Sequence, residues 1–320
     1  MSRLYIAISS QKLSFITDGD IEFYSRLGVS RIIAGSCALL FLVSMRAAFA
    51  SLGLLCSSVV ANPVANPPAG DNWAVIIAGV RFPRPAPPPP SSCRLLTHSP
   101  LPPPPCALRR RSPPQSNTYD NYRHQADACH AYQIVKANGI PEDKIIMFAY
   151  DDIASSKENP FPGKVFNRPT HKGTAGVDVY AGCNIDYAGK SITPQTFAAV
   201  LAGNTTVVAK QCAKAGKNDC RSGTKVLKSG PNDNVFVNFV DHGGSRIIGF
   251  PDGSQPSTMT ASALVKTLKA MQRKKMYSKL TFYMEACNSG SMFDGLLTDD
   301  MNIYVTTAAN PSEPSYGCFW

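Results

Sequence analysis

Short apolar runs alternate with amphipathic segments along this chain, a pattern that predicts strands and helices in turn. The apolar runs have the length and the β-branched or aromatic content of buried strands. They lie at 73–79, 144–150, 235–240, 279–284 and 302–307. The segments predicted as helices lie at 121–138, 193–201 and 259–276. This alternation predicts an α/β fold, a mostly parallel sheet flanked by helices on both faces.

Two of the predicted helices show an apolar inner face at helical spacing. In 121–138 this face is formed by Ala128, Ala131, Ile134 and Val135. In 259–276 it is formed by Leu264, Leu268 and Met271. Glycine and proline are scattered through 151–187, so we expect a loop there, and 292–297 is predicted to be a helical turn.

Two of the predicted strands end in segments that carry reactive side chains. The run at 235–240 leads into Asp241-His242-Gly243-Gly244, and the run at 279–284 leads through Glu285 into a small-residue loop at Cys287. The carboxyl ends of parallel strands meet at one edge of a sheet, where such folds gather their ligands. We therefore expect the Cys287 thiol and the His242 imidazole to lie close together.

A neighbouring thiol and imidazole can perform nucleophilic catalysis without a metal or a cofactor, and we predict neither. A thiolate is a strong nucleophile, a histidine exchanges its proton, and glycines after the histidine let backbone N–H groups face an oxyanion. His242 precedes Cys287 by 45 residues, near the roughly 50 residues of caspases. The alternative is a buried structural cysteine and a core histidine. We favour catalysis because both residues lie at the end of a predicted strand and each is followed by a turn that contains glycine.

The net charge of +10 does not indicate nucleic-acid binding, because its distribution is uneven. Residues 80–115 contain six arginines and no acidic residue, and the remaining net positive charge is distributed over the rest of the chain without a cluster. The ten cysteines are too few for a small disulfide scaffold.

Residues 80–115 differ in composition from the rest of the chain. They contain 13 of the 26 prolines, which predicts a solvated, polyproline-like insert. One alternative is a ligand for SH3-type domains. We favour the hypothesis of a retained in-frame intron, because Val80 requires a codon that begins with GT and Gln115 can be encoded by CAG.

Residues 1–61 are predicted to be a targeting region that is cleaved. Their apolar runs end in small residues, at Ala48-Phe49-Ala50 and at Val59-Val60-Ala61, as signal peptides do. The alternative is a membrane anchor, which Arg46 near its middle disfavours, so we expect no stable anchor. Entry into the secretory pathway would make Asn204-Thr205-Thr206 a glycosylation site and would permit a local disulfide between Cys212 and Cys220.

Four ordered motifs resemble those of the legumain family, the asparaginyl endopeptidases or vacuolar processing enzymes. They are Asn121-Tyr-Arg-His-Gln-Ala-Asp127, Asp241-His-Gly-Gly244, Glu285-Ala-Cys-Asn-Ser-Gly-Ser291 and Thr306-Thr-Ala-Ala-Asn-Pro311. The resemblance covers roughly 72–79 and 116–320. It implies a caspase-like fold and a cysteine endopeptidase that cleaves proteins and peptides after Asn, and after Asp at lower pH.

The resemblance also implies roles for individual residues. Cys287 would be the nucleophile, His242 the general acid and base, Asn121 the residue that orients His242, and Gly243 an oxyanion donor together with Cys287. The pocket for the Asn side chain would be formed by Arg123, His124, Glu285 and Ser315. An amide has donors and an acceptor, so it needs a carboxylate such as Glu285 and a donor such as Arg123 opposite it. Without the resemblance, Arg123 and Glu285 would be interpreted as an ordinary ion pair.

The domain organisation and the alternatives follow from these assignments. We expect a targeting region at 1–61, the start of the peptidase domain at 62–79, the insert at 80–115 and the rest of the domain at 116–320, without a C-terminal prodomain. The alternative functions are an asparaginyl ligase, a subunit that resembles GPI transamidase, and an inactive fragment. The resemblance implies a vacuolar, lysosomal or extracellular destination.

Overall fold

The computed structural model describes residues 70–79, 119–168, 176–216, 218–251 and 257–317. The predicted targeting region at 1–61 and the predicted insert at 80–115 lie outside these residues. None of the helices that the structure describes is long and apolar enough to cross a bilayer.

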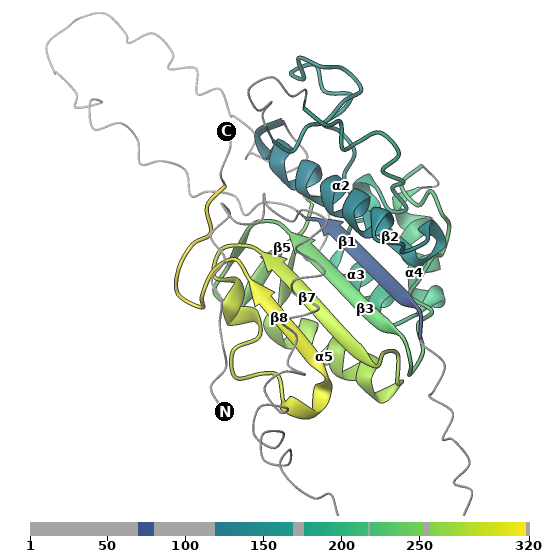
Figure 1. The fold of residues 1–320 in the computed structure, drawn as a ribbon, viewed down its shortest axis with the longest axis vertical. Helices are drawn as coiled ribbons and strands as arrows, with labels where there is room; N and C mark the ends of the chain where they lie inside the picture. Colours follow the sequence, from purple (N-terminus) through teal and green to yellow (C-terminus); the bar gives the residue numbers. More distant parts are fainter. Residues whose placement is uncertain (1–69, 80–118, 169–175, 217, 252–256, 318–320) are drawn as a thin grey trace, which may run out of the picture.

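Five parallel strands form the central sheet, in the order β2-β1-β3-β7-β8 (Figure 1). They are β1 (Asn72–Ala78), β2 (Ile145–Phe148), β3 (Asn234–Val240), β7 (Lys279–Glu285) and β8 (Ile303–Thr307). Each corresponds to one of the predicted apolar runs. β1 lies inside the sheet, paired with β2 on one side and over its whole length with β3 on the other.

Helices cover both faces of the sheet, which confirms the predicted α/β class. Alternate residues of β1 belong to different cores because strand side chains point to opposite faces. Ala74 and Ile76 pack with α2 (Tyr122–Ala137), whereas Val75 and Ile77 pack with α3 (Pro194–Leu201) and α5 (Ala261–Arg273). In Figure 1, α2 lies in front of the strands, and α3 and α5 lie behind them.

The strand that leads to Cys287 is less covered than a doubly buried strand. In β7, Leu280, Phe282 and Met284 are buried, whereas Thr281 and Tyr283 on the other face are only half-buried. α2 lies above β1 and β2 and leaves this part of the sheet partly accessible.

The inner face of α2 differs from the prediction. Ala128 and Val135 are buried as expected, but Ala131 and Ile134 are only half-buried. The buried stripe runs instead through polar and mixed side chains. These are His124, Gln125, Cys129 and Tyr132. The prediction followed apolar residues alone, whereas this helix turns polar groups inward near the end of the sheet.

A helix, α4 (Thr205–Ala215), lies where no helix was predicted. Only one of its residues, Val208, is buried, and Val207 and Cys212 are half-buried against the core. Asn204 caps it, and the Asn204 Oδ1 accepts a hydrogen bond from the Val207 N–H at 3.1 Å. Cys212 therefore lies on this helix.

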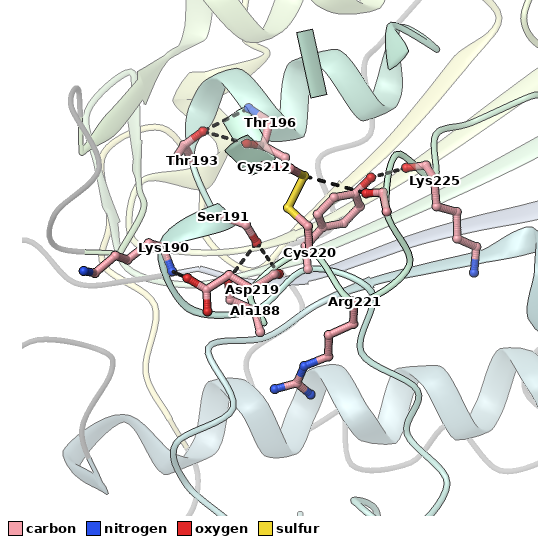
Figure 2. The surroundings of a disulfide bond; sticks show 12 residues. Ala188, Lys190, Ser191, Thr193, Thr196, Cys212, Asp219, Cys220, Arg221 and Lys225 are labelled. Atoms are coloured by element: carbon pink, nitrogen blue, oxygen red, sulfur yellow. Dashed lines mark hydrogen bonds between the residues drawn. A yellow bond between two sulfur atoms is a disulfide. The ribbon is translucent and has the colours of Figure 1, made fainter. Parts of the chain in front are cut away.

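Two disulfides are present among the described residues. The predicted bond between Cys212 and Cys220 is confirmed and joins α4 to the segment that follows it (Figure 2). A second bond, between Cys129 and Cys183, was not predicted. It ties α2 to the segment 151–187, whose described residues, 151–168 and 176–187, have the expected irregular structure.

A small antiparallel sheet follows directly after the DHGG segment. It consists of β4 (Gly243–Gly244), β5 (Ile247–Gly249) and β6 (Thr258–Thr260). α5 consequently begins at Ala261 and not at 259, with the Thr260 side chain capping the Ala263 N–H at 3.2 Å. Its predicted inner residues, Leu264, Leu268 and Met271, are buried.

Short 3₁₀ turns complete the fold. They are η2 (Tyr119–Asn121), η3 (Glu142–Lys144), η4 (Gly189–Ser191), η5 (Ser289–Met292) and η6 (Asp299–Met301). The helical turn predicted at 292–297 begins earlier, with η5 two residues after Cys287, and continues as hydrogen-bonded turns over 293–296.

Candidate active site

The pairing of β3 with β7 places the two reactive residues at the same level of the sheet. Val240 pairs with Glu285, and each strand continues for two residues to His242 and Cys287. Neighbouring strands lie about 4.8 Å apart, so the two backbones leave the sheet side by side. The Asp241 N–H extends this pairing with a hydrogen bond of 2.9 Å to the Glu285 carbonyl oxygen.

Gly243 lies where the two strand ends approach most closely. A Cβ atom on Gly243 would be 2.8 Å from the Cys287 carbonyl oxygen and 3.0 Å from the Ala286 Cβ. There is no room for a side chain at this position, so only glycine fits. Its N–H therefore lies near the backbone of the turn that carries Cys287.

Cys287 lies at the start of a tight turn and is half-buried. Its sulfur is not in a disulfide and lies 3.8 Å from the Ser315 carbonyl oxygen. The next residue, Asn288, has a φ of 54°, a left-handed conformation that asparagine tolerates better than most residues. The Asn288 N–H donates to the Glu313 carbonyl oxygen at 2.9 Å, which joins this turn to the segment that follows β8.

α2 begins beside His242. The Asn121 Oδ1 lies 2.9 Å from the His242 Nε2, so Nε2 is assigned as the donor and Nδ1 carries the lone pair. Asn121 is 3% exposed, which shields this hydrogen bond from water. The imidazole can thus accept a proton through Nδ1 while the amide fixes its orientation.

His124 lies behind His242 and is 1% exposed. Its ring centroid is 4.7 Å from that of His242, with an angle of 76° between the planes. Its Nδ1 lies 3.7 Å from the Asp241 Oδ1. Burial, and next the Arg123 charge, hold the pKa of His124 well below its usual value.

The carboxylate of Glu285 lies next to two of the predicted pocket residues. The Ser315 hydroxyl donates to the Glu285 Oε1 at 2.7 Å. Burial raises the pKa of Glu285, whereas the Ser315 hydrogen bond and the Arg123 charge act in the opposite direction. The Arg123 side chain passes under Gly317, where a Cβ atom would be 2.9 Å from its Nε. Arg123, Glu285 and Ser315 therefore meet beside the sulfur.

Two carboxyl groups at this site were not predicted. Asp127 follows Arg123 by one helical turn, and burial and the Glu285 charge raise the pKa of Asp127 to about 7. Asp241 is fully enclosed, and burial raises its pKa well above the usual value. The four-residue spacing from Arg123 to Asp127 was a signal in the sequence, whereas nothing there distinguished Asp241 from an ordinary turn residue.

The structure brings together all predicted residues of the catalytic and pocket sets. These are Asn121, Arg123, His124, His242, Gly243, Glu285, Cys287 and Ser315. They come from the start of α2, the ends of β3 and β7, and the segment after β8. Asn204, the predicted glycosylation site, is exposed and caps the start of α4. Among the described residues, no group of three metal-binding side chains is found.

Known proteins of one peptidase family are similar to this chain. The model of the peptidase C13 family matches residues 115–320. The chain is 50% identical to a hemoglobinase of Schistosoma japonicum over 204 residues, and 52% identical to a legumain of Mus musculus over 205 residues. It is also 47% identical to a vacuolar-processing enzyme of Vicia sativa over 204 residues.

These alignments cover 64% of this chain but only 43%, 42% and 38% of the three relatives in turn. The chain therefore spans about two-fifths of the length of the curated relatives it matches. The matched region begins after β1, which lies at 72–78.

Proposed function

The chain belongs to the peptidase C13 family, and on this premise we propose that it is a cysteine endopeptidase that cleaves peptide bonds after asparagine. The observation that carries the proposal is the common level of Cys287 and His242 on adjacent strands, with Asn121 bonded to the far side of the imidazole. A thiol, a base and a residue that orients the base are the parts of an activated nucleophile.

The reaction follows from these positions. His242 Nδ1 takes the proton of Cys287, and the sulfur attacks the carbonyl carbon of the scissile bond. The N–H groups of Gly243 and Cys287 bind the developing oxyanion. The intermediate collapses when His242 donates the proton to the leaving amine, and a thioester of the N-terminal fragment remains. Water, deprotonated by His242, hydrolyses the thioester and regenerates the thiol.

The cluster beside the sulfur selects the side chain that precedes the cleaved bond. The Glu285 carboxylate accepts from the amide NH₂ of a substrate asparagine, and Arg123 donates to the amide oxygen. Ser315 orients Glu285 through its hydroxyl. An aspartate substrate loses its negative charge at lower pH and then resembles the amide, so cleavage after aspartate increases as the pH falls.

Fluorogenic peptides that differ only in Asn, Asp or Gln before the scissile bond test this function between pH 4 and pH 7. We expect turnover of the Asn peptide, less of the Asp peptide with a rise at low pH, and none of the Gln peptide. Cys287→Ala should abolish turnover because it removes the nucleophile. A correctly folded wild-type protein that turns over no Asn peptide would contradict the proposal.

The two disulfides indicate passage through an oxidising, secretory compartment. We infer that the protein continues to a vacuole, a lysosome or the cell exterior. The name of the Vicia sativa relative, a vacuolar-processing enzyme, supports the first of these.

We also infer that Asn204 is glycosylated. Asn204, Thr205 and Thr206 are all exposed, and the cap at α4 uses only the Oδ1 of Asn204 and not the Nδ2 to which a glycan attaches. Expression in a eukaryotic secretory host should yield a product whose mass falls on treatment with an N-glycosidase. Thr206→Ala should remove this shift, and the matched variant Thr205→Ala should keep it. A shift that survives Thr206→Ala would place the glycan elsewhere.

A further inference from the structure

The first turn of α2 contacts the candidate catalytic histidine through two side chains. Asn121 and His124 are three residues apart, so both face the same side of the helix start. Asn121 holds the Nε2 edge of His242, and the ring of His124 lies against the same imidazole at 4.7 Å with the two planes nearly perpendicular. Such an edge-to-face pair restricts the rotation of both rings.

Asp241 also lies against His124. Its Oδ1 lies 3.7 Å from the His124 Nδ1 and also accepts the backbone N–H of His242. Gly79 at the end of β1 leaves room for this carboxyl, because a Cβ atom there would be 2.3 Å from the Asp241 Oδ2. His124 and Asp241 are each 1% exposed, so the ring is buried in contact with His242 and close to Asp241.

Both ring nitrogens of His124 and the Oδ2 of Asp241 are buried without a hydrogen-bond partner among the described residues. Buried polar groups in this condition cost free energy and do not form the contact with His242, which is made by the ring. His124 also has almost no accessible surface with which to contact a substrate.

We propose that His124 is a positioning residue for His242, whose ring, close to Asp241, fixes the plane of the catalytic imidazole relative to Cys287. This inference rests on the proposed function and assigns to His124 a role different from the pocket role implied by the family resemblance. The charged and titratable groups that act on the ring are Arg123 on α2 and Asp241 and His242 after β3. Asp127 and Glu285 lie further out: Glu285 acts on Asp127 and on Asp241. Burial keeps His124 neutral, so it adds no positive charge beside an imidazole that must itself become charged.

Three variants at one position separate the positioning role from a pocket role. His124→Phe keeps the ring, His124→Gln keeps polarity without the ring, and His124→Ala removes both. His130→Ala is the matched control, because His130 is a half-buried histidine on the same helix that contacts Asn167 instead. Thermal unfolding of each variant shows which of them keep the fold. If His124→Ala does not fold, the comparison of His124→Phe with His124→Gln still tests the positioning role.

The first measurement needs no peptide substrate. The rate at which iodoacetamide alkylates Cys287 is followed against pH, because this rate reports how well His242 assists the thiol. We expect His124→Gln and His124→Ala to displace the acidic limb of the wild-type profile, and His124→Phe and His130→Ala to reproduce it. A wild-type profile in His124→Gln overturns the proposal, whether or not the protein cleaves peptides.

The second measurement is peptide turnover. A displaced imidazole should lower kcat roughly 10- to 100-fold in His124→Gln, with KM and the Asn-to-Asp ratio within about twofold of wild type. His124→Phe should restore kcat to within about threefold, since the ring contact is preserved. A changed KM or Asn-to-Asp ratio with kcat intact would instead make His124 a pocket residue and overturn the proposal. Absence of wild-type turnover would refute the proposed function alone, because the alkylation profile would still decide the role of His124.

Discussion

Single glycines allow three chain segments to close around the candidate active site. Gly243 brings the turn after His242 against the Cys287 carbonyl, and Gly79 brings the end of β1 against the Asp241 carboxyl. Neither needs an unusual backbone angle, so the constraint in both cases is the space for a side chain. Gly79 lies outside the region that matches the family, yet it contacts the carboxyl that lies close to His124.

Gly79→Ala should therefore be destabilising. The added methyl group would lie 2.3 Å from the Asp241 Oδ2 and 2.9 Å from its Cγ, and the enclosed carboxyl has little room to move. Overpacking of this kind costs about 1–3 kcal/mol, which urea unfolding at constant pH would measure. Gly230→Ala is the control, since the nearest atom there is 3.9 Å away. Equal stability of the two variants would contradict the close packing at Gly79.

α2 is the element that brings the candidate site together. Asn121 is its N-cap residue, its first two turns carry Arg123, His124 and Asp127, and its third turn is bonded through Cys129 to Cys183. Any shift of this helix would move the partner of His242 and the pocket arginine together. The disulfide therefore stabilises the helix on which the site depends, as well as the fold.

The two disulfides should contribute unequally to stability. Cys129 and Cys183 are 54 residues apart, and Cys212 and Cys220 only 8. In the chain-entropy treatment, the longer loop is worth about 4 kcal/mol and the shorter one about 2.5 kcal/mol. Cys129→Ala with Cys183→Ala should thus lower the free energy of unfolding by more than Cys212→Ala with Cys220→Ala, measured by urea unfolding without reductant. A larger loss from the second pair would contradict this order.

Much of the fold could be predicted from the sequence, because strong local patterns coincide with burial. The five sheet strands are short apolar runs, and the DHGG and Cys287 turns follow two of them, so parallel pairing alone brings His242 to Cys287. α4 escaped prediction because it buries only Val208, and its cap residue Asn204 has a second interpretation as a glycosylation site. The disulfide between Cys129 and Cys183 and the burial of Asp241 could not be predicted in this way. Both depend on contacts between segments far apart in the sequence, which no local pattern indicates.

Across the whole molecule, several carboxyl groups are gathered at the carboxyl edge of one sheet. Burial raises the pKa of Asp127, Asp241 and Glu285, so each binds its proton more tightly in the folded state than in the unfolded chain. Stability from such a group is complete below its ordinary pKa and is lost as the pH rises through the folded value. His124, whose pKa is lowered, acts in the opposite direction below its usual value of 6.5.

A single variant isolates one of these contributions. The pKa of Asp127 rises from 3.8 to about 7, so the folded state holds the extra proton between these two values. Asp127→Asn removes this titration and leaves the others in place. Relative to wild type, the variant should gain stability steadily from pH 4 to pH 7, in thermal unfolding followed at half-unit steps. A difference that does not change with pH would show that Asp127 has its ordinary pKa in the folded protein.

The position of β1 in the sheet has a practical consequence for anyone who defines this protein by its similarity to relatives. Among the strands of this sheet, β2 pairs only with β1, and β3 pairs with β1 along one of its two edges. A fragment cut at residue 115 would retain all the reactive side chains and still expose two unpaired strand edges, which invite association with other chains. Such a fragment would look chemically complete in an alignment and would be expected to precipitate in the test tube.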